Sequence, residues 1–303
     1  MERYNHCTLC PRKCHIDRRE ARGACGMGDT LTIARASLHD WEEPCISGER
    51  GSGTIFFSGC PLGCIYCQNR EIAKGEVGLP ITADRLLAIF YELEAAGAHN
   101  INLVTPTHFV PTIAVAIRKA KAAGFMLPFV YNTSGYESVE TLKSLAGLID
   151  IYLTDMRYAT PILAKAFSCA EDYPEIAKAS LAEMVAQTGA PVYDAQGMML
   201  SGTIVRFLLL PGHVIDAKLR LHQVYAAHGE QVVMSLMRQY TPMAGMPAPL
   251  NRSVRDGEYQ SFVDYALALG ITHAYTQEDG TDTASFIPKF DYTGVLSPER
   301  SQP

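Results

Sequence analysis

The chain contains the stretch Ser58-Gly-Cys-Pro-Leu-Gly-Cys-Ile-Tyr-Cys-Gln-Asn69, which directly follows the apolar run Thr54-Ile-Phe-Phe57. Its three cysteines are Cys60, Cys64 and Cys67. Three thiolates on one short loop can hold three corners of a four-iron cluster, and without a fourth cysteine one iron stays open to an outside ligand. The alternative is a structural zinc site, which usually has four ligands in paired CxxC knuckles. These three cysteines do not pair in that way, so the spacing favours a cluster.

Composition limits the class of protein. The 303 residues are 48% hydrophobic and 19% charged, which predicts a globular protein with a sizeable core. The net charge of −6 gives no electrostatic footprint for nucleic acid. No apolar run reaches transmembrane length, and the first residues lack a secretory apolar region. Nine cysteines without an export signal predict a reducing cytoplasm and metal ligation.

Residues 1–50 form a predicted cysteine-rich module. The cysteines Cys7, Cys10, Cys14 and Cys25 follow the pattern CxxC, then three residues, then ten. We expect them to bind a second metal centre, zinc or iron–sulfur, whose binding supplies folding energy, with Cys45 as a spare ligand. The alternative is a flexible arm with free thiols. The basic residues between them either neutralise a cluster or form a solvated loop; they are Arg12, Lys13, Arg18, Arg19 and Arg22.

Residues 51–303 predict an α/β fold with a carboxyl-terminal extension. Short apolar runs alternate with amphipathic segments, for example Leu86, Ile89, Phe90 and Leu93 after the cap candidate Thr82. The candidate strands are 54–58, 101–105, 127–132, 149–154, 203–210 and 232–237. Six such alternations predict a parallel sheet with helices outside, wholly or partly closed into a barrel.

Polar residues follow every candidate strand. Beyond the cysteine loop these segments are Thr105-Pro-Thr-His108, Asn132-Thr-Ser-Gly135, Asp155-Met-Arg157, Pro211-Gly-His213 and Arg238-Gln-Tyr-Thr241. Turn chemistry explains any single one. Because active sites of barrels lie at the carboxyl ends of the strands, all of them together predict a site there, and this position singles out His108 and His213 among the histidines. Cys169 is expected to be a small buried hydrophobe.

The cysteine loop, with Tyr66 before its last cysteine, resembles the radical S-adenosylmethionine (SAM) superfamily. The cysteine-rich start and four further stretches resemble homologues of pyruvate formate-lyase activating enzyme; the stretches are Glu43-Pro-Cys-Ile-Ser-Gly48, Gly51-Ser-Gly-Thr-Ile-Phe-Phe-Ser-Gly-Cys60, Cys67-Gln-Asn69 and Asn102-Leu-Val-Thr-Pro-Thr-His108. The resemblance extends from Cys7 to the tail Phe286-Ile-Pro-Lys-Phe-Asp291. The resemblance implies a partial (β/α)6 TIM-like barrel. It also implies a [4Fe-4S] cluster that cleaves SAM to a 5′-deoxyadenosyl radical.

The resemblance implies roles for single residues. Cys60, Cys64 and Cys67 would bind the cluster, and Tyr66 would lie near the adenine. Thr105 to His108 take the place of a Gly-Gly-Glu-Pro segment that this chain lacks, so Thr105 and Thr107 would contact the SAM amino group. The remaining expected contacts to SAM are Asn132, Ser134, the pair Asp155 and Arg157, and, for adenine or ribose, Gln239 and Tyr240.

The resulting hypothesis is a radical SAM oxidoreductase that takes hydrogen from a protein or peptide, as in activation of a glycyl radical enzyme. The resemblance implies an electron donor such as flavodoxin or ferredoxin, with no nucleic-acid or membrane partner. Activating enzymes often carry extra cysteines after the cluster loop, whereas this chain has its extra cysteines in front. The alternatives are a non-catalytic iron–sulfur or zinc-binding interaction protein, and a radical SAM enzyme acting on a small molecule or RNA.

Overall fold

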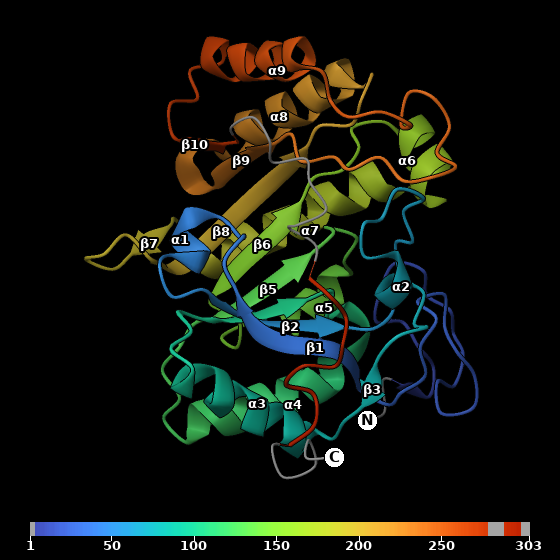
Figure 1. Cartoon of the computed structure of the whole chain (residues 1–303), viewed down its shortest axis with the longest axis vertical. Coiled ribbons are helices and arrows are strands. Elements are labelled where there is room, and N and C mark those ends of the chain that lie inside the picture. Colours follow the sequence, from blue (N-terminus) through green and yellow to red (C-terminus); the bar gives the residue numbers. More distant parts are fainter. Residues whose placement is uncertain (1–3, 278–287, 298–303) are drawn as a thin grey trace.

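A single sheet forms the centre of the computed structural model, which describes residues 4–277 and 288–297 (Figure 1). Within these residues ten strands join in the order β10-β9-β8-β6-β5-β4-β2-β1-β3, with β7 beside β8. The strands are β1 Thr32–His39, β2 Ser52–Phe57, β3 Leu79–Pro80, β4 Ile101–Val104, β5 Phe129–Thr133, β6 Ile151–Asp155, β7 Val192–Tyr193, β8 Met199–Leu208, β9 Val233–Met237 and β10 Ala274–Thr276.

The six predicted strands are confirmed as β2, β4, β5, β6, β8 and β9, and each pairs in parallel with the next. The order ends at β10 and β3, so the sheet is curved but not closed, consistent with a partial TIM-like barrel. Parallel strands are buried on both faces, which explains why every residue of β2 is buried.

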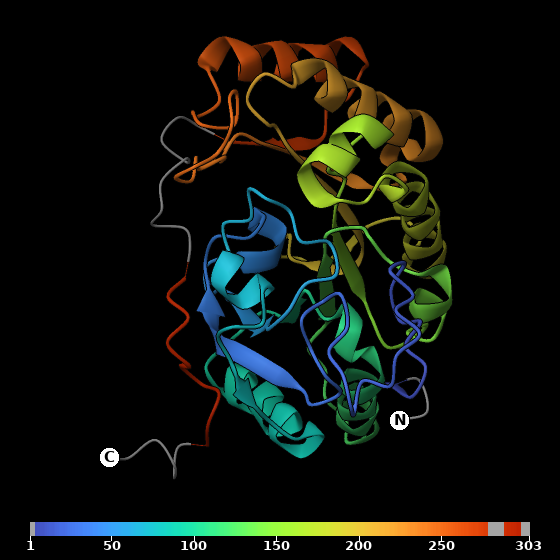
Figure 2. The same ribbon diagram turned by 90° about the vertical axis from the view of Figure 1, so that its right-hand side faces the viewer.

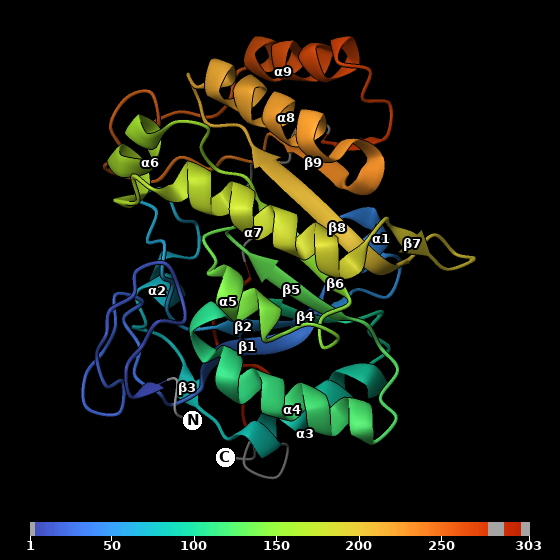
Figure 3. The same ribbon diagram turned by 180° about the vertical axis from the view of Figure 1, so that it is seen from behind.

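Helices cover the outer face of the sheet (Figure 3). The longer ones are α3 Ala83–Ala95, α4 Val110–Ala122, α7 Tyr173–Thr188, α8 Val214–His228 and α9 Asp256–Ala268; α3 and α9 lie at opposite ends of the molecule (Figure 2). The shorter ones are α1 Pro44–Ser47, α2 Arg70–Ala73, α5 Val139–Lys143, α6 Pro161–Ser168, η2 Thr107–Phe109 and η3 Gly229–Gln231. Thr82 caps α3 as predicted, because its side chain accepts the Arg85 N–H at 3.1 Å.

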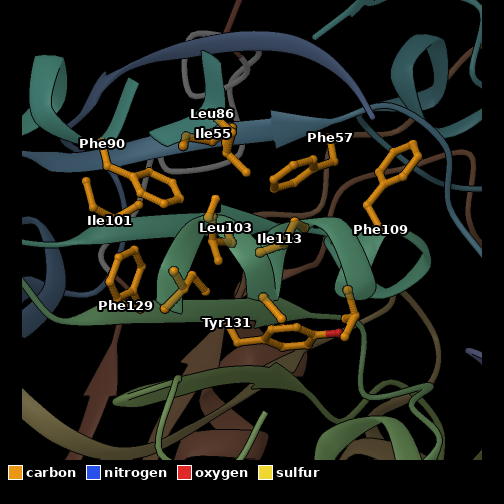
Figure 4. Packing of buried hydrophobic residues seen from close by; sticks show 14 of the residues in the cluster. Ile55, Phe57, Leu86, Phe90, Ile101, Leu103, Phe109, Ile113, Phe129 and Tyr131 are labelled. Carbon is orange, nitrogen blue, oxygen red and sulfur yellow. The ribbon is translucent and has the colours of Figure 1, made fainter. Parts of the chain in front are cut away.

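The main core lies between the sheet and these helices (Figure 4). The predicted helix positions Leu86 and Phe90 pack there against Ile55, Leu103 and Phe129, all of them buried. A different cluster fills the inner face, where Ile46 of α1 contacts strand residues such as Val130 and Ile204. The short helix α1 therefore plugs the inside of the open barrel.

Strand β1 is an element that the sequence analysis missed. It pairs antiparallel with β2, with Ile33 opposite Phe57 and His39 opposite Ser52. The irregular cysteine-bearing segment therefore ends at residue 31, whereas the predicted module extended to residue 50. Residues 290–295 run along β1, where Thr293 accepts the Ala36 N–H at 2.8 Å. Phe286 and Ile287 of the carboxyl-terminal motif lie outside the described residues.

We call residues 4–31 the front segment; it lies beside α2 and α5 (Figure 3). The Thr141 hydroxyl of α5 donates to the Leu9 carbonyl at 2.8 Å, and the hydroxyls of Tyr4 and Thr112 lie 3.0 Å apart. Arg18 is 1% exposed. Its guanidinium donates to the carbonyls of Met27, Gly28 and His108 and stacks over Tyr4. The solvated-loop interpretation is therefore wrong for Arg18.

Replacing Arg18 with Met should lower the free energy of unfolding by about 3 kcal/mol, because buried carbonyls would lose a charged donor. Arg19→Met is the control: Arg19 is exposed and forms a surface ion pair with Asp17, so its loss should leave the free energy of unfolding nearly unchanged. Chemical denaturation under anaerobic conditions measures both values. Equal effects of the two substitutions would contradict a structural role for Arg18.

Candidate functional site

The thiols of Cys60, Cys64 and Cys67 line one cavity of about 120 Å³ at the carboxyl end of β2. The loop turns at Gly59, whose φ of +89° is in the left-handed region. A Cβ at Gly59 would lie 2.3 Å from Met27 Cγ and 2.7 Å from the Cys25 carbonyl oxygen, so no other residue fits. We call this space the cluster cavity.

The front segment holds the cysteine loop in place. The Cys60 N–H donates to the Cys25 carbonyl at 3.2 Å. Arg12 donates to the Pro61 carbonyl at 2.9 Å and to the Leu62 carbonyl at 3.2 Å. It also reaches the Ser168 carbonyl at 2.9 Å. Arg12, like Arg18, is therefore a clamp between segments and not part of a solvated loop.

The chemistry of the three thiols fits an iron–sulfur cluster. The Ser168 hydroxyl donates to Cys64 Sγ at 3.0 Å, and Arg157 Nη1 lies 3.7 Å from the same sulfur, which suits a thiolate. Burial raises the pKa of Cys60, and it raises the pKa of Cys67 to about 12, so binding iron would release protons. Cys60, Cys64 and Cys67 would be the ligands.

The same thiols fit the zinc alternative less well, because three cysteines in a CxxxCxxC spacing do not form the paired CxxC knuckles of a structural zinc site. A single zinc ion draws its thiolates together, each at about 2.3 Å from the metal. In a cluster each thiolate binds its own iron, so the sulfurs stay farther apart.

A buried network of charges forms the wall opposite the cysteines. Asp155 accepts from Arg157 Nη2 at 2.5 Å and from Arg206 Nε at 2.8 Å. Burial alone would raise the pKa of Asp155, but Arg206 and Arg157 hold it below its ordinary value. Arg206 also donates to Asn132 Oδ1 at 2.7 Å and to Glu42 Oε2 at 3.1 Å. Asp155 thus ends β6 with both oxygens paired, and caps no helix.

Glu42 completes this network from the connection between β1 and α1. Its Oε1 accepts from the amides of Asn102 at 3.0 Å and Asn132 at 3.1 Å. The sequence analysis missed Glu42 and Arg206. Arg206 carried a signal, because it is a charge inside the apolar run Ile204-Val-Arg-Phe207, and buried arginine almost always has a partner.

The cluster cavity continues into a second space of about 300 Å³, which we call the lumen cavity. Asn132, Asp155, Arg157 and Arg206 line both. Of the other residues expected to contact SAM, Thr105 and Ser134 line the cluster cavity, and Tyr66 and Gln239 line the lumen cavity. These expected residues therefore gather around one continuous space.

Two expected residues line neither cavity. The Thr107 hydroxyl donates to Glu137 at 2.6 Å and is fully buried. The Tyr240 hydroxyl donates to the Leu250 carbonyl at 2.6 Å, and its ring packs behind Tyr66 with the centroids 6.2 Å apart. In this structure the side chains of Thr107 and Tyr240 contact Glu137 and Tyr66, and their expected SAM contacts stay predictions.

Thr105 has a φ of +58°, which is strained for a β-branched residue. Its N–H donates to the Asn132 carbonyl at 2.8 Å, which fixes the turn after β4. Strain of this kind is often found where a backbone faces a ligand.

His108 holds the start of the cysteine loop through a hydrogen bond to Ser58. Its Nε2 lies 2.7 Å from the Ser58 carbonyl, so this nitrogen carries the hydrogen, while Nδ1 has no partner among the described residues. Burial lowers the pKa of His108 to about 3, which keeps the ring neutral. His213 is near Phe167 at the start of α8 and lines neither cavity.

Two cysteine predictions are wrong. Cys169 is exposed at the end of α6, because its left-handed conformation turns the chain out of the helix. Cys45 is not near the front cysteines; it is buried in α1 against inner-face residues such as Val130 and Leu153. Burial raises the pKa of Cys45 to about 11.

Glu137 predicts a pH-dependent stability. Burial raises its pKa to about 7 from an ordinary 4.5, although hydroxyls of Thr107, Thr133 and Tyr131 donate to it. Between these values the folded state binds more protons than the unfolded state, so stability is full below pH 4.5 and falls by about 3 kcal/mol up to pH 7. Glu137→Gln should flatten this slope, measured by denaturation at several pH values. The exposed Glu140→Gln is the control, and an unchanged slope in Glu137→Gln would refute the assignment.

Another cavity, of about 600 Å³, lies at the amino ends of β9 and β10 among residues such as Val233 and Ala274. Sites in barrels of this kind form at the carboxyl ends of strands. No helix in the described ranges has the length and apolar character needed to cross a membrane.

Comparison with known proteins agrees with this geometry. Residues 54–184 match the Radical SAM superfamily, so this part of the chain is a radical SAM domain. An uncharacterised protein of Methanocaldococcus jannaschii is 24% identical over 247 residues, which are 79% of this chain and 67% of that protein.

Solved structures are similar at the level of the fold. A radical SAM methyltransferase from Sphaerobacter thermophilus aligns with a TM-score of 0.52 and 17% identity, over 76% of this chain and 68% of its own. SuiB of Streptococcus suis, bound to its precursor peptide SuiA, aligns with a TM-score of 0.49 and 12% identity, over 74% of this chain and 48% of its own.

Proposed function

We propose that this chain, whose residues 54–184 form a radical SAM domain, cleaves SAM reductively and abstracts hydrogen from a polypeptide substrate. One observation carries the proposal: the three thiols of the cysteine loop open onto a cavity that continues into the charged lumen cavity. A [4Fe-4S] cluster on Cys60, Cys64 and Cys67 would supply, when bound, the electron that splits SAM into methionine and a 5′-deoxyadenosyl radical.

The chain's own residues would bind and orient SAM between the two cavities. Asn132, Asp155 and Arg157 line both, so a ligand that spans them meets all three. Arg157 Nη2 donates to Asp155 Oδ2 at 2.5 Å, and this bond fixes the position of the guanidinium. Such preorganised charges need no rearrangement when a ligand arrives.

Glu43 supports a substrate with a hydrogen-bond donor. Its side chain lines the lumen cavity, and Oε2 is buried without a partner among the described residues. The carboxylates there (Glu42, Glu43 and Asp155) outnumber the guanidiniums of Arg157 and Arg206. A peptide N–H or an amino group would satisfy the free oxygen. The subfamily resemblance favours a polypeptide, with a glycine of a glycyl radical enzyme as one example.

The alternatives fit less well. A non-catalytic metal-binding protein has no need of a buried network of four charged side chains, whose desolvation costs stability. The acidic balance disfavours RNA, and a small-molecule substrate remains compatible with the lumen cavity. We also propose a low-potential one-electron donor such as flavodoxin or ferredoxin, and the reducing cytoplasm as the compartment, since all nine cysteines are free thiols.

The test is SAM cleavage by anaerobically reconstituted and reduced protein. The wild type should release methionine and 5′-deoxyadenosine, and Cys64→Ala should reduce both to background. Cys169→Ala is the matched control, because Cys169 is exposed, and it should keep wild-type activity within about twofold. A wild type with a four-iron spectrum that does not cleave SAM would overturn the proposal.

Glu43→Gln should make the protein more stable than wild type at pH 8, because burial raises the pKa of Glu43 and its ionised form therefore costs folding energy. SAM cleavage without substrate should stay within about twofold of wild type. Thermal denaturation and product release measure the two quantities. A Glu43→Gln variant that is less stable than wild type would show a structural role and remove the support for a substrate donor.

A further inference from the structure

We infer that Cys7, Cys10, Cys14 and Cys25 bind a second iron–sulfur cluster, and that this cluster lies in contact with the cysteine loop of the first. The metal binding is independent of the proposed function. The contact rests on it, because it needs the cluster at Cys60, Cys64 and Cys67.

The front segment gathers the four thiols although it has no helix or strand in residues 5–31. Cys7 N–H donates to the Ile16 carbonyl at 2.9 Å, and His15 N–H returns to the Cys7 carbonyl at 3.0 Å, so the two arms of the loop lie side by side. Cys7, Cys10 and Cys25 are each 6% exposed. The apolar cluster around Cys7 is small, with Tyr4, Leu9 and Ile16, whereas Cys25 packs at the edge of the main core.

Two of the four sulfurs lie beside the same glycine. A Cβ built on Gly23 would lie 3.6 Å from Cys14 Sγ and 3.5 Å from Cys25 Sγ, so both sulfurs flank the same point. The Ala24 N–H donates to Cys14 Sγ at 3.3 Å, a bond that thiolate ligands commonly accept. Three buried thiols and one partly buried thiol, on a segment without regular secondary structure in residues 5–31, are an arrangement in which a metal supplies folding energy.

The neighbouring cysteine set favours a cluster over zinc. Cys60, Cys64 and Cys67 lie in the radical SAM domain and fit an iron–sulfur cluster. The front set likewise consists of cysteines alone, whose thiolates are the ligands of iron–sulfur clusters, and its four residues could bind all four irons of one cluster.

A direct hydrogen bond joins the two sets. The Cys25 carbonyl accepts the Cys60 N–H at 3.2 Å, so a ligand residue of one centre is bonded to a ligand residue of the other. Gly59 permits this approach, since any side chain there would strike the Cys25 carbonyl at 2.7 Å. Arg12 adds three more bonds from the front segment to the loop and to Ser168. The hydrogen bond between Cys60 and Cys25 would give electrons a short route between the two clusters.

The decisive experiment uses the triple variant Cys60→Ser, Cys64→Ser and Cys67→Ser. After anaerobic reconstitution with iron and sulfide it should keep about four irons, while wild type should hold about eight. Adding Cys10→Ser and Cys14→Ser should remove the remaining iron. Cys45→Ser and Cys169→Ser are controls that should lose none. A triple variant with zinc and no iron, or with no metal, would overturn the inference.

Two measurements on wild type cover the case in which the variants fail to fold. About four irons per chain, with a single cluster in the Mössbauer spectrum, would refute the second centre and leave SAM cleavage intact. About eight irons without SAM cleavage would instead refute the proposed function. In fully reduced protein, electron paramagnetic resonance should show magnetic interaction between the clusters, which Cys14→Ser should abolish. Two independent, non-interacting signals would contradict the contact.

Discussion

The site depends on Arg206, a guanidinium buried on the inner face of the sheet. It binds Asp155 of β6, Asn132 of β5 and Glu42 before α1, and so joins three parts of the chain that are distant in sequence. Isolated, such a charge could not be buried; with three partners its position is fixed. Because Asp155 in turn holds Arg157, the cation near Cys64 is set by the same network.

The front segment is part of the site and not an appendage. Arg12 and the Cys25 carbonyl fasten the cysteine loop, and Arg18 fixes the backbone of His108, whose ring holds Ser58 just before that loop. A segment with no helix or strand in residues 5–31 therefore determines where three thiols point. This explains why Arg18 is buried and Arg12 is partly buried: both bind backbone carbonyls, whereas Arg19 is exposed.

Buried carboxylates that lack a cationic partner or a full set of hydrogen bonds lower the stability of the fold, and two of them lie near the site. Glu43 has a free oxygen in the lumen cavity, and Glu137 receives only hydroxyl donors below the cluster cavity. Thr105, with its positive φ, adds strain at the same end of the sheet. Natural proteins often carry such costs at functional sites, where the ligand compensates for them.

Local patterns in the sequence determined much of this protein. The spacing of Cys60, Cys64 and Cys67 indicated the cluster, and alternating apolar runs located six strands and placed Asp155, Asn132 and Thr105 at their ends. These features depend on neighbours in the chain, which a sequence displays directly.

Only the tertiary structure decided which polar groups meet. Glu42 and Arg206 are 164 positions apart, Thr107 turns to Glu137, and Cys45 lies far from the other cysteines although it is near them in sequence. Such partnerships arise when the sheet brings its carboxyl ends together, and no short-range pattern records them.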